Sequence, residues 1–411
     1  MTKSFPRKFF QSIVCSSTHN FTKPCYNFFL MLEFINQELE SLKKSGLYRP
    51  LKTIEKIDGS KIYIDGKELI CFCSNDYLGL SNHPKVKKMA IETIKEFGVG
   101  AGASRLISGN TIIHEELEKK IAKFKKRESA IVFSTGYMAN IGAITALTDE
   151  KDTIIIDRLN HASIIDACKL SKARLQVYSH KDMIALEKIL AKSDKYKKRL
   201  IVTDSIFSMD GDIAPLPQIA KLAKKYNAIT MIDCAHATGV LGENGRGAEE
   251  HFGIEGQIDI VMGTLSKAVG SLGGFIAGSF ELIDFLRNKA RSFIYTTSLP
   301  PSICAASIAA LEIIENEPQL RKRLWDNIGF FNRRRAAINR DPTTETPIIP
   351  ILIGNEEKTM GISRKLFEDG LFVSGIRFPT VAKGEARLRI TITANHSKKE
   401  LEMLSNLLAL I

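Results

Sequence analysis

The chain has 411 residues, of which 44% are hydrophobic and 25% charged, so it can bury a large core and is expected to form two or three domains. No stretch approaches the roughly 18 to 20 uninterrupted apolar residues of a membrane-spanning helix, which argues against a membrane partner. The net charge of +12 is spread along the chain, which disfavours a nucleic-acid partner and favours a field that attracts anionic substrates.

Residues 1–30 differ from the rest of the chain, because they are basic and contain no Asp or Glu. Such a composition is typical of a mitochondrial transit peptide. The alternative is a start codon assigned too early, since Met31 directly precedes an amphipathic helix pattern that starts at Leu32. Seven irregularly spaced cysteines match no disulfide framework and no zinc site, so no metal is predicted and the cytoplasm is the expected compartment, or the mitochondrion if the extension is a true transit peptide.

Residues 31–75 are assigned to an N-terminal helix and arm, and residues 76–310 to a large α/β domain. In the large domain, helical patterns such as Gln218–Tyr226 alternate with short apolar runs, as in a mostly parallel sheet covered by helices. The predicted strands are Thr153–Ile156, Leu200–Thr203, Ala228–Ile232, Ile258–Met262 and Gly274–Ala277.

Residues 311–411 are assigned to a smaller C-terminal α+β domain. Its elements are predicted in the order of a long charged helix from about Leu311 through Arg335, a strand at Ile348–Ile353, a helix at Met360–Asp369, a strand at Arg387–Thr393 and a closing helix.

Three residues at the ends of predicted strands indicate pyridoxal 5′-phosphate (PLP) chemistry. Lys267 follows a strand among small residues, where its amine could reach a carbonyl group in a crevice. Asp233 ends another strand of the same sheet, where a buried carboxylate would keep a pyridine nitrogen protonated, and His236 could hydrogen-bond a phenolic oxygen. Each residue alone would more often be structural, but the three together favour a PLP site.

Two further segments fit the same cofactor. Ser134–Asn140 opens a helix, whose free amides and dipole suit a phosphate, and Tyr137 could cover the ring. His161 follows the strand Thr153–Ile156, so it lies at the same sheet edge, where an imidazole could stack on a flat ring. The alternatives are an ordinary capped helix start and a structural histidine.

From about Leu39 to the C-terminus the sequence resembles the α-oxoamine synthases. Short motifs carry the resemblance: Ser74–Leu80, Ser104–Gly109, Asn160–Ser163, Phe207–Asp212, Asp233–His236, Thr264–Lys267 and Ala386–Thr391. The family implies fold type I of the PLP-dependent transferases and a homodimer with active sites at the subunit interface. This chain departs from the family at Cys234, where relatives often have an acidic residue, and in its basic N-terminal extension.

The resemblance also implies a role for each matching residue. Lys267 would hold PLP as a Schiff base and His161 would stack on its ring, which makes these two, with Asp233 and His236, the expected catalytic residues. The remaining predicted contacts are Ser208 and His236 to the phenolic oxygen, Gly136, Tyr137 and Thr264 to the ring and phosphate, Thr297 to the phosphate in the partner subunit, Asn75 and Arg389 to the substrate carboxylate, and Arg49 and Thr380 to the acyl substrate.

Within the family, the sequence is most similar to the biotin-pathway branch that joins L-alanine to a pimeloyl thioester of coenzyme A or a carrier protein, releasing CO2. Ile376–Val381 and Arg387–Thr391 favour this branch over glycine C-acetyltransferases, and the lack of long extensions favours it over 5-aminolevulinate synthases. Both stay open as alternatives. A catalytically silent PLP-fold partner subunit is disfavoured by the presence of Lys267.

Overall fold

The computed structural model describes residues 25–337 and 344–410, which divide into two compact units. The first unit, up to Lys52, contains helix α1 (Cys25–Lys44), which begins earlier than the predicted helix start at Leu32. Residues 1–24, on which the transit-peptide prediction mainly rests, lie outside the described part of the chain. Among the described helices, none combines the length and apolarity needed to cross a bilayer.

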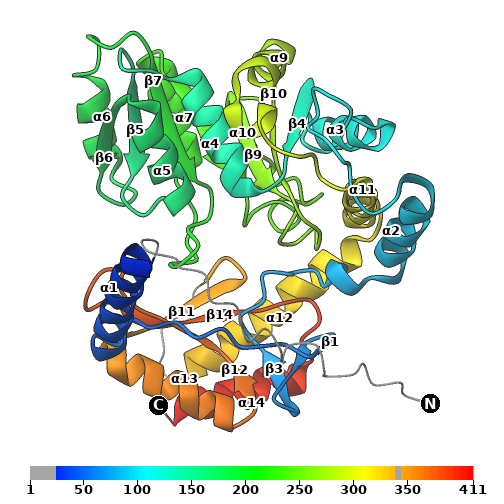
Figure 1. The fold of residues 1–411 in the computed structure, drawn as a ribbon, viewed down its shortest axis with the longest axis vertical. Coiled ribbons are helices and arrows are strands. Elements are labelled where there is room, and N and C mark those ends of the chain that lie inside the picture. The colour runs from blue at the N-terminus through cyan, green and yellow to red at the C-terminus, as the bar shows by residue number, and fades with distance from the viewer. Residues whose placement is uncertain (1–24, 338–343, 411) are drawn as a thin grey trace, which may run out of the picture. The chain divides into compact units, whose positions relative to one another are not determined.

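The second unit, from Thr53 onward, contains a seven-stranded sheet in the order β4-β10-β9-β8-β7-β5-β6 (Figure 1). Its strands are β4 (Ser129–Phe133), β5 (Thr153–Asp157), β6 (Arg174–Tyr178), β7 (Arg199–Asp204), β8 (Ile229–Asp233), β9 (Ile260–Thr264) and β10 (Gly274–Gly278). Strands β5 to β9 are parallel, whereas β10 is antiparallel to β9 and β4. The mostly parallel sheet is therefore confirmed, and its two outer strands, β4 and β6, are strands that the sequence pattern did not predict.

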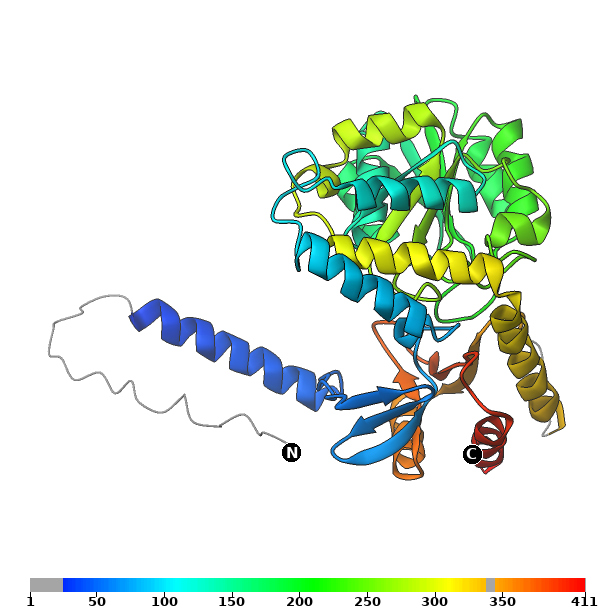
Figure 2. The ribbon, with the colours of Figure 1, turned by 90° about the vertical axis from the view of Figure 1, so that its right-hand side faces the viewer.

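Helices cover both faces of this sheet, which explains why its central strands are almost continuously apolar. Alternate residues of one strand enter different cores, as when Ile155 of β5 joins one cluster and Ile154 the other. One face packs on α4 (Gly136–Leu147), α5 (Ala162–Ser171), α9 (Phe280–Lys289) and α10 (Arg291–Ile294), and the other on α3 (Ile112–Phe124), α6 (Met183–Leu190), α7 (Leu216–Lys225) and α11 (Pro301–Asn316). Helix α2 (Pro84–Phe97) lies beside α11 (Figure 2), and α8 spans Ala248–Phe252.

Two smaller sheets complete the second unit. The antiparallel sheet β11-β14-β13 contains β11 (Ile348–Gly354), β13 (Ser374–Ile376) and β14 (Ala386–Thr391). The sheet β1-β2-β3-β12 joins β1 (Lys56–Asp58), β2 (Lys61–Ile64) and β3 (Lys67–Cys71) to β12 (Leu371–Phe372). Residues assigned to the N-terminal arm thus share a sheet with the C-terminal region, and the proposed domain boundaries stay predictions.

One helix prediction is wrong. The expected long charged helix from about Leu311 through Arg335 is two helices, because α11 ends at Asn316 and α12 (Pro318–Ala337) begins with a proline. A proline has no amide hydrogen and pushes the preceding residue, Glu317, out of helical conformation, so the break falls here. Helices α13 (Glu356–Glu368) and α14 (Lys398–Ala409) follow as the pattern predicted, with α13 starting earlier than expected.

Candidate active site

Four polar residues lie at one edge of the seven-stranded sheet, three of them predicted site residues and the fourth, Asp204, not predicted. Asp204 ends β7 and is paired with Asp233, which ends β8, and each residue is only 4% exposed. Lys267 follows β9, and His161 is the N-cap residue of α5, after β5. The carboxyl ends of parallel strands meet at one edge, where α/β proteins commonly bind ligands.

The amine of Lys267 is neutral more often at physiological pH than that of an ordinary lysine. Its Nζ lies 2.8 Å from Nε2 of His236. Burial lowers the pKa of Lys267 to about 8, and Arg389 adds to this, while Asp233 and Asp204 act in the opposite direction. Because only an unprotonated amine attacks a carbonyl or accepts a proton, this environment suits a reactive lysine.

His236 is a neutral, hydrogen-bonded imidazole in the same place. Burial lowers its pKa well below the usual value, and the cations of Lys267 and Arg389 lower it further. Its Nδ1 lies 2.7 Å from the hydroxyl oxygen of Tyr77, which is fully buried. The ring is thus held on both sides, by Tyr77 and by Lys267.

Two donors fix the carboxylate of Asp233. The side-chain amide of Asn140, on α4, donates to Oδ2 over 2.8 Å, and the backbone amide of Ala235 donates to Oδ1 over 2.8 Å. Asn140 also donates to Ser163 on α5. Asn140 was part of a predicted motif but had no predicted role, because its neighbour across the sheet is visible only in the fold.

The ring of His161 is uncharged at neutral pH. Burial lowers its pKa, with Lys267 adding to the effect and Asp233 opposing it. Its Nδ1 lies 2.7 Å from the Ser163 hydroxyl, and its backbone amide donates to Oδ2 of Asp204 over 2.8 Å. An uncharged, oriented imidazole is suited to stacking on a flat ring, and this role stays a prediction.

The start of α4, at Gly136, packs so closely on β9 and β10 that it leaves no room for side chains, and we call this region the cradle. A Cβ on Gly136 would lie 3.0 Å from Met262, and one on Gly274 would lie 2.6 Å from Gly136. The Thr264 hydroxyl lies 2.8 Å from that of Ser266. Free amides at a helix start beside two hydroxyl groups suit a phosphate, so the predicted phosphate contacts at Gly136 and Thr264 fit the local structure.

Two more predicted residues, Thr297 and Tyr137, lie beside this cradle. Ser134 donates a hydrogen bond to the carbonyl oxygen of Thr297 over 3.2 Å. Tyr137 is 46% exposed, and its hydroxyl donates to Asp166 over 2.5 Å. Both positions are compatible with the predicted contacts, which the described chain by itself does not test.

A second group of residues forms a cationic end of the site. Arg389, on β14, is 6% exposed and donates through Nη2 to Oδ1 of Asn75 over 3.2 Å and through Nε to the carbonyl oxygen of Ser208 over 2.6 Å. The Tyr77 hydroxyl lies 3.3 Å from the same Asn75 oxygen. Hydrogen bonds therefore connect Lys267 through His236 and Tyr77 to the residues predicted to bind the substrate carboxylate.

Three predicted contacts are left as predictions. Ser208 is placed here by its carbonyl group, and the role of its hydroxyl at the phenolic oxygen rests on the resemblance. Thr380 lies between β13 and β14, in a turn where its amide donates to the carbonyl oxygen of Arg377. Arg49 belongs to the first unit.

His180 holds the loop that carries Ser208. Its ring nitrogens lie 3.0 Å from Asp157 and 2.9 Å from Asp212, and its ring meets Phe207 edge to face. Burial lowers the pKa of His180, but the hydrogen bonds and charges of the two aspartates outweigh it and raise the pKa to about 9. The imidazolium thus ties the family motif Phe207–Asp212 to the sheet.

We expect His180→Gln to lower the free energy of unfolding by about 2 kcal/mol near pH 6 and by much less near pH 9.5. The folded-state pKa of His180, about 9, lies above its ordinary value, so the stabilisation is full below about pH 6.5 and is lost as the pH rises through 9. Denaturant unfolding of both proteins at both pH values measures the difference. An equal difference at the two pH values would contradict the assignment.

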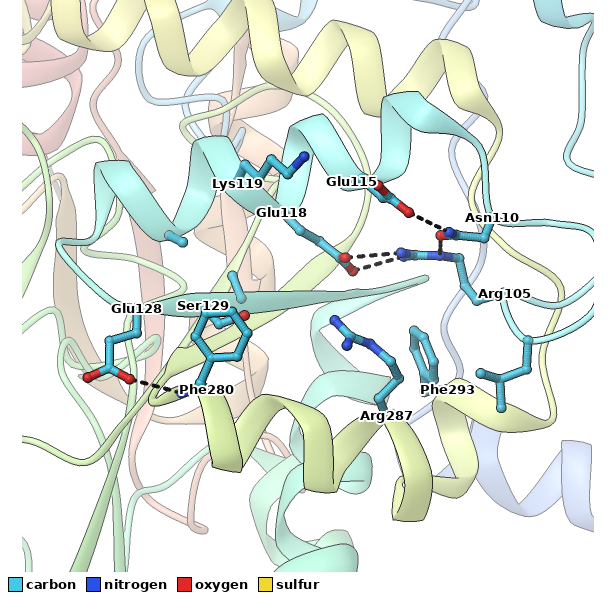
Figure 3. A pocket seen from close by; sticks show the side chains of 13 residues that line it. Arg105, Asn110, Glu115, Glu118, Lys119, Glu128, Ser129, Phe280, Arg287 and Phe293 are labelled. Carbon is cyan, nitrogen blue, oxygen red and sulfur yellow. Dashed lines mark hydrogen bonds and ion pairs between the residues drawn. The ribbon is translucent and has the colours of Figure 1, made fainter.

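A cavity of about 570 Å³ lies elsewhere, where α3 packs beside β4 (Figure 3). There Arg105 donates two hydrogen bonds, of 2.9 and 3.0 Å, to the Glu118 carboxylate, and both side chains are less than 10% exposed. Glu118 also accepts from the backbone amide of Val132, and Arg105 donates to Asn110. Because these buried charges satisfy one another, the family motif Ser104–Gly109 has a structural role here.

Comparisons with known proteins agree with this geometry. The model of the aminotransferase class I and II family matches residues 67–408. An 8-amino-7-oxononanoate synthase of Thermoanaerobacter pseudethanolicus is 52% identical over 90% of this chain and 94% of its own length, and one of Symbiobacterium thermophilum is 48% identical over 90% and 95%.

Solved structures of related enzymes have the same fold. A serine palmitoyltransferase from S. paucimobilis, solved with a bound PLP-myriocin aldimine, has a TM-score of 0.88 and 32% identity over 93% of this chain and 97% of its own. An 8-amino-7-oxononanoate synthase from Francisella tularensis has a TM-score of 0.73 and 33% identity over 83% and 97%. The predicted fold type I architecture is therefore confirmed.

Proposed function

The chain belongs to the class I and II aminotransferase family, and within it to the 8-amino-7-oxononanoate synthases, and from this premise we propose that it condenses L-alanine with a pimeloyl thioester. The new bond joins the α-carbon of alanine to the thioester carbonyl carbon. The thiol leaves, the alanine carboxyl group departs as CO2, and a proton replaces it at the α-carbon. The product, 8-amino-7-oxononanoate, belongs to biotin biosynthesis, and the predicted enzyme class is confirmed.

Pyridoxal phosphate, when bound, withdraws electrons from the α-carbon of alanine, so that a proton and the carboxyl group can leave. The described residues fit this cofactor. Asp233 offers a buried carboxylate oriented by two donors, Lys267 offers an amine of lowered pKa, and Gly136 opens a cradle that a Cβ would fill. The observation that carries the proposal is that this amine and this carboxylate face one sheet edge.

Each residue then has a defined task. Asp233 holds the proton on the pyridine nitrogen, since an adjacent carboxylate favours the charged form. The Lys267 amine, whose lowered pKa makes the neutral form more accessible, moves the proton at the α-carbon. Arg389 and Asn75 bind the substrate carboxylate, and His161 covers the ring.

The active unit in this proposal is a homodimer. The loop that contains Val99 and Ile107 exposes these apolar side chains by 79% and 81%, as interface residues often are. The same loop is tied to the cofactor cradle, because Ser298 donates its amide to Ala103 over 3.0 Å and Thr297 accepts from Ser134. The cytoplasm stays the proposed compartment.

Mass spectrometry of the product tests the proposal. Purified protein with PLP is incubated with pimeloyl-CoA and, separately, L-alanine, glycine or L-serine, the last because serine palmitoyltransferases share the fold. We expect the mass of 8-amino-7-oxononanoate with alanine and little product with the other two. Preference for glycine or serine would reassign the chain within its family, and no ketone from any pair would overturn the proposal.

A further inference from the structure

We propose that Asp204 is a positioning residue, which acts as an uncharged acceptor and fixes His161 over the cofactor face of the site. The inference rests on the proposed function only for the presence of PLP, and it holds whichever amino acid and thioester the enzyme uses. Asp204 was not among the residues that the sequence singled out. Its place at the end of β7, beside Asp233, appears only when the sheet is assembled.

Asp204 ties the loop between β5 and α5 to strand β7. Its Oδ2 accepts the backbone amide of His161 over 2.8 Å, and its own amide donates to Oδ1 of Asn160 over 3.3 Å. Asn160 in turn donates to the carbonyl oxygen of Val202 on β7 over 2.8 Å. His161 is the N-cap residue, whose amide has no partner within the helix, so Asp204 supplies the acceptor that the helix cannot.

The charges around Asp204 favour its protonated form. It faces Asp233 across adjacent strands, and both residues are 4% exposed, so two ionised carboxylates would repel each other with little solvent between them. Burial and Asp233 raise the pKa of Asp204 well above its ordinary value and Asp157 adds to the effect, which outweighs the opposing hydrogen bond from the His161 amide and the charge of Lys267. Asp233 instead accepts two hydrogen bonds, one on each carboxylate oxygen, and such donors favour the charged form of a carboxyl group.

This division gives the two neighbouring aspartates different tasks. One negative charge suffices to hold a proton on the pyridine nitrogen, and a second one would add an unpaired buried charge. A neutral Asp204 still accepts the His161 amide, so it sets the height and tilt of the imidazole without disturbing the charge balance. Because a side chain misplaced by about 1 Å near the reacting atoms can cost roughly 100-fold in rate, this support matters.

The test compares Asp204→Asn with Asp204→Ala in the holoenzyme. Asparagine keeps an oxygen acceptor in an uncharged side chain, whereas alanine has no acceptor. We expect kcat/KM to stay within about threefold of wild type for the asparagine variant and to fall about 10- to 100-fold for the alanine variant. We also expect the visible circular dichroism of bound PLP, which reports how the ring is held, to change in the alanine variant only.

Asp152→Ala is the matched control, because Asp152 is also buried but lies just before β5, at the amino end of that strand and away from the site. There its carboxylate accepts hydrogen bonds from the backbone amides of Asp149 and Lys198. It should lower the thermal stability and leave the dichroism of PLP as in wild type. If Asp204→Ala does not fold, Asp204→Ser takes its place, since the serine side chain is too short to accept a hydrogen bond from the His161 amide. Wild-type dichroism in the alanine or serine variant overturns the proposal, and so does an asparagine variant as impaired as the alanine one.

Discussion

Lys267→Ala is expected to lower kcat/KM for the condensation by at least about 1000-fold, because it removes the amine that we propose tethers the cofactor and moves the α-proton. Lys267→Arg should be almost as inactive, since a guanidinium stays protonated where the Lys267 pKa is about 8. Steady-state rates with alanine and pimeloyl-CoA measure the loss.

Two observations accompany this prediction. Borohydride reduction is expected to fix a PLP adduct at position 267 in the wild type and not in the substituted proteins. Lys224→Ala, which removes an exposed lysine of α7, serves as the control and should keep both rate and adduct. A Lys267→Ala protein with more than about a tenth of the wild-type rate would show that another group does this work.

Arg389→Gln is expected to raise KM for L-alanine by roughly 100-fold, since it removes the buried cation that we propose binds the substrate carboxylate. KM for the thioester should change far less. Arg389→Lys keeps the charge but loses the fork that reaches both Asn75 and Ser208, so an intermediate increase of about 10-fold is expected.

The second substrate separates this role from a general structural one. If Arg389→Gln raised KM for the thioester and left KM for alanine unchanged, Arg389 would belong to the acyl site and not to the carboxylate site. A loss of rate at saturating concentrations of both substrates, with unchanged KM values, would likewise contradict the assignment.

The reactive lysine could be found from the sequence because its signal is local. Lys267 follows an apolar strand and Asp233 ends one, and strand ends are recognisable from a few neighbouring residues. The break before Pro318 was equally local, yet the charged pattern ran across it and hid it. Strands β4 and β6 were not predicted, and they are the two outer strands of the sheet; β6 is mostly exposed or half-buried, so it lacks the apolar run that marks the central strands.

The sequence alone determined the family, the cofactor and the mostly parallel sheet, since motifs and hydrophobic runs of contiguous residues encode them. Only the tertiary structure decided that Asp204 lies beside Asp233, that Tyr77 contacts His236, and that Asn140 donates to Asp233. These contacts join residues far apart in the chain. Which pairs meet depends on strand order and helix packing, and no short stretch of sequence contains that information.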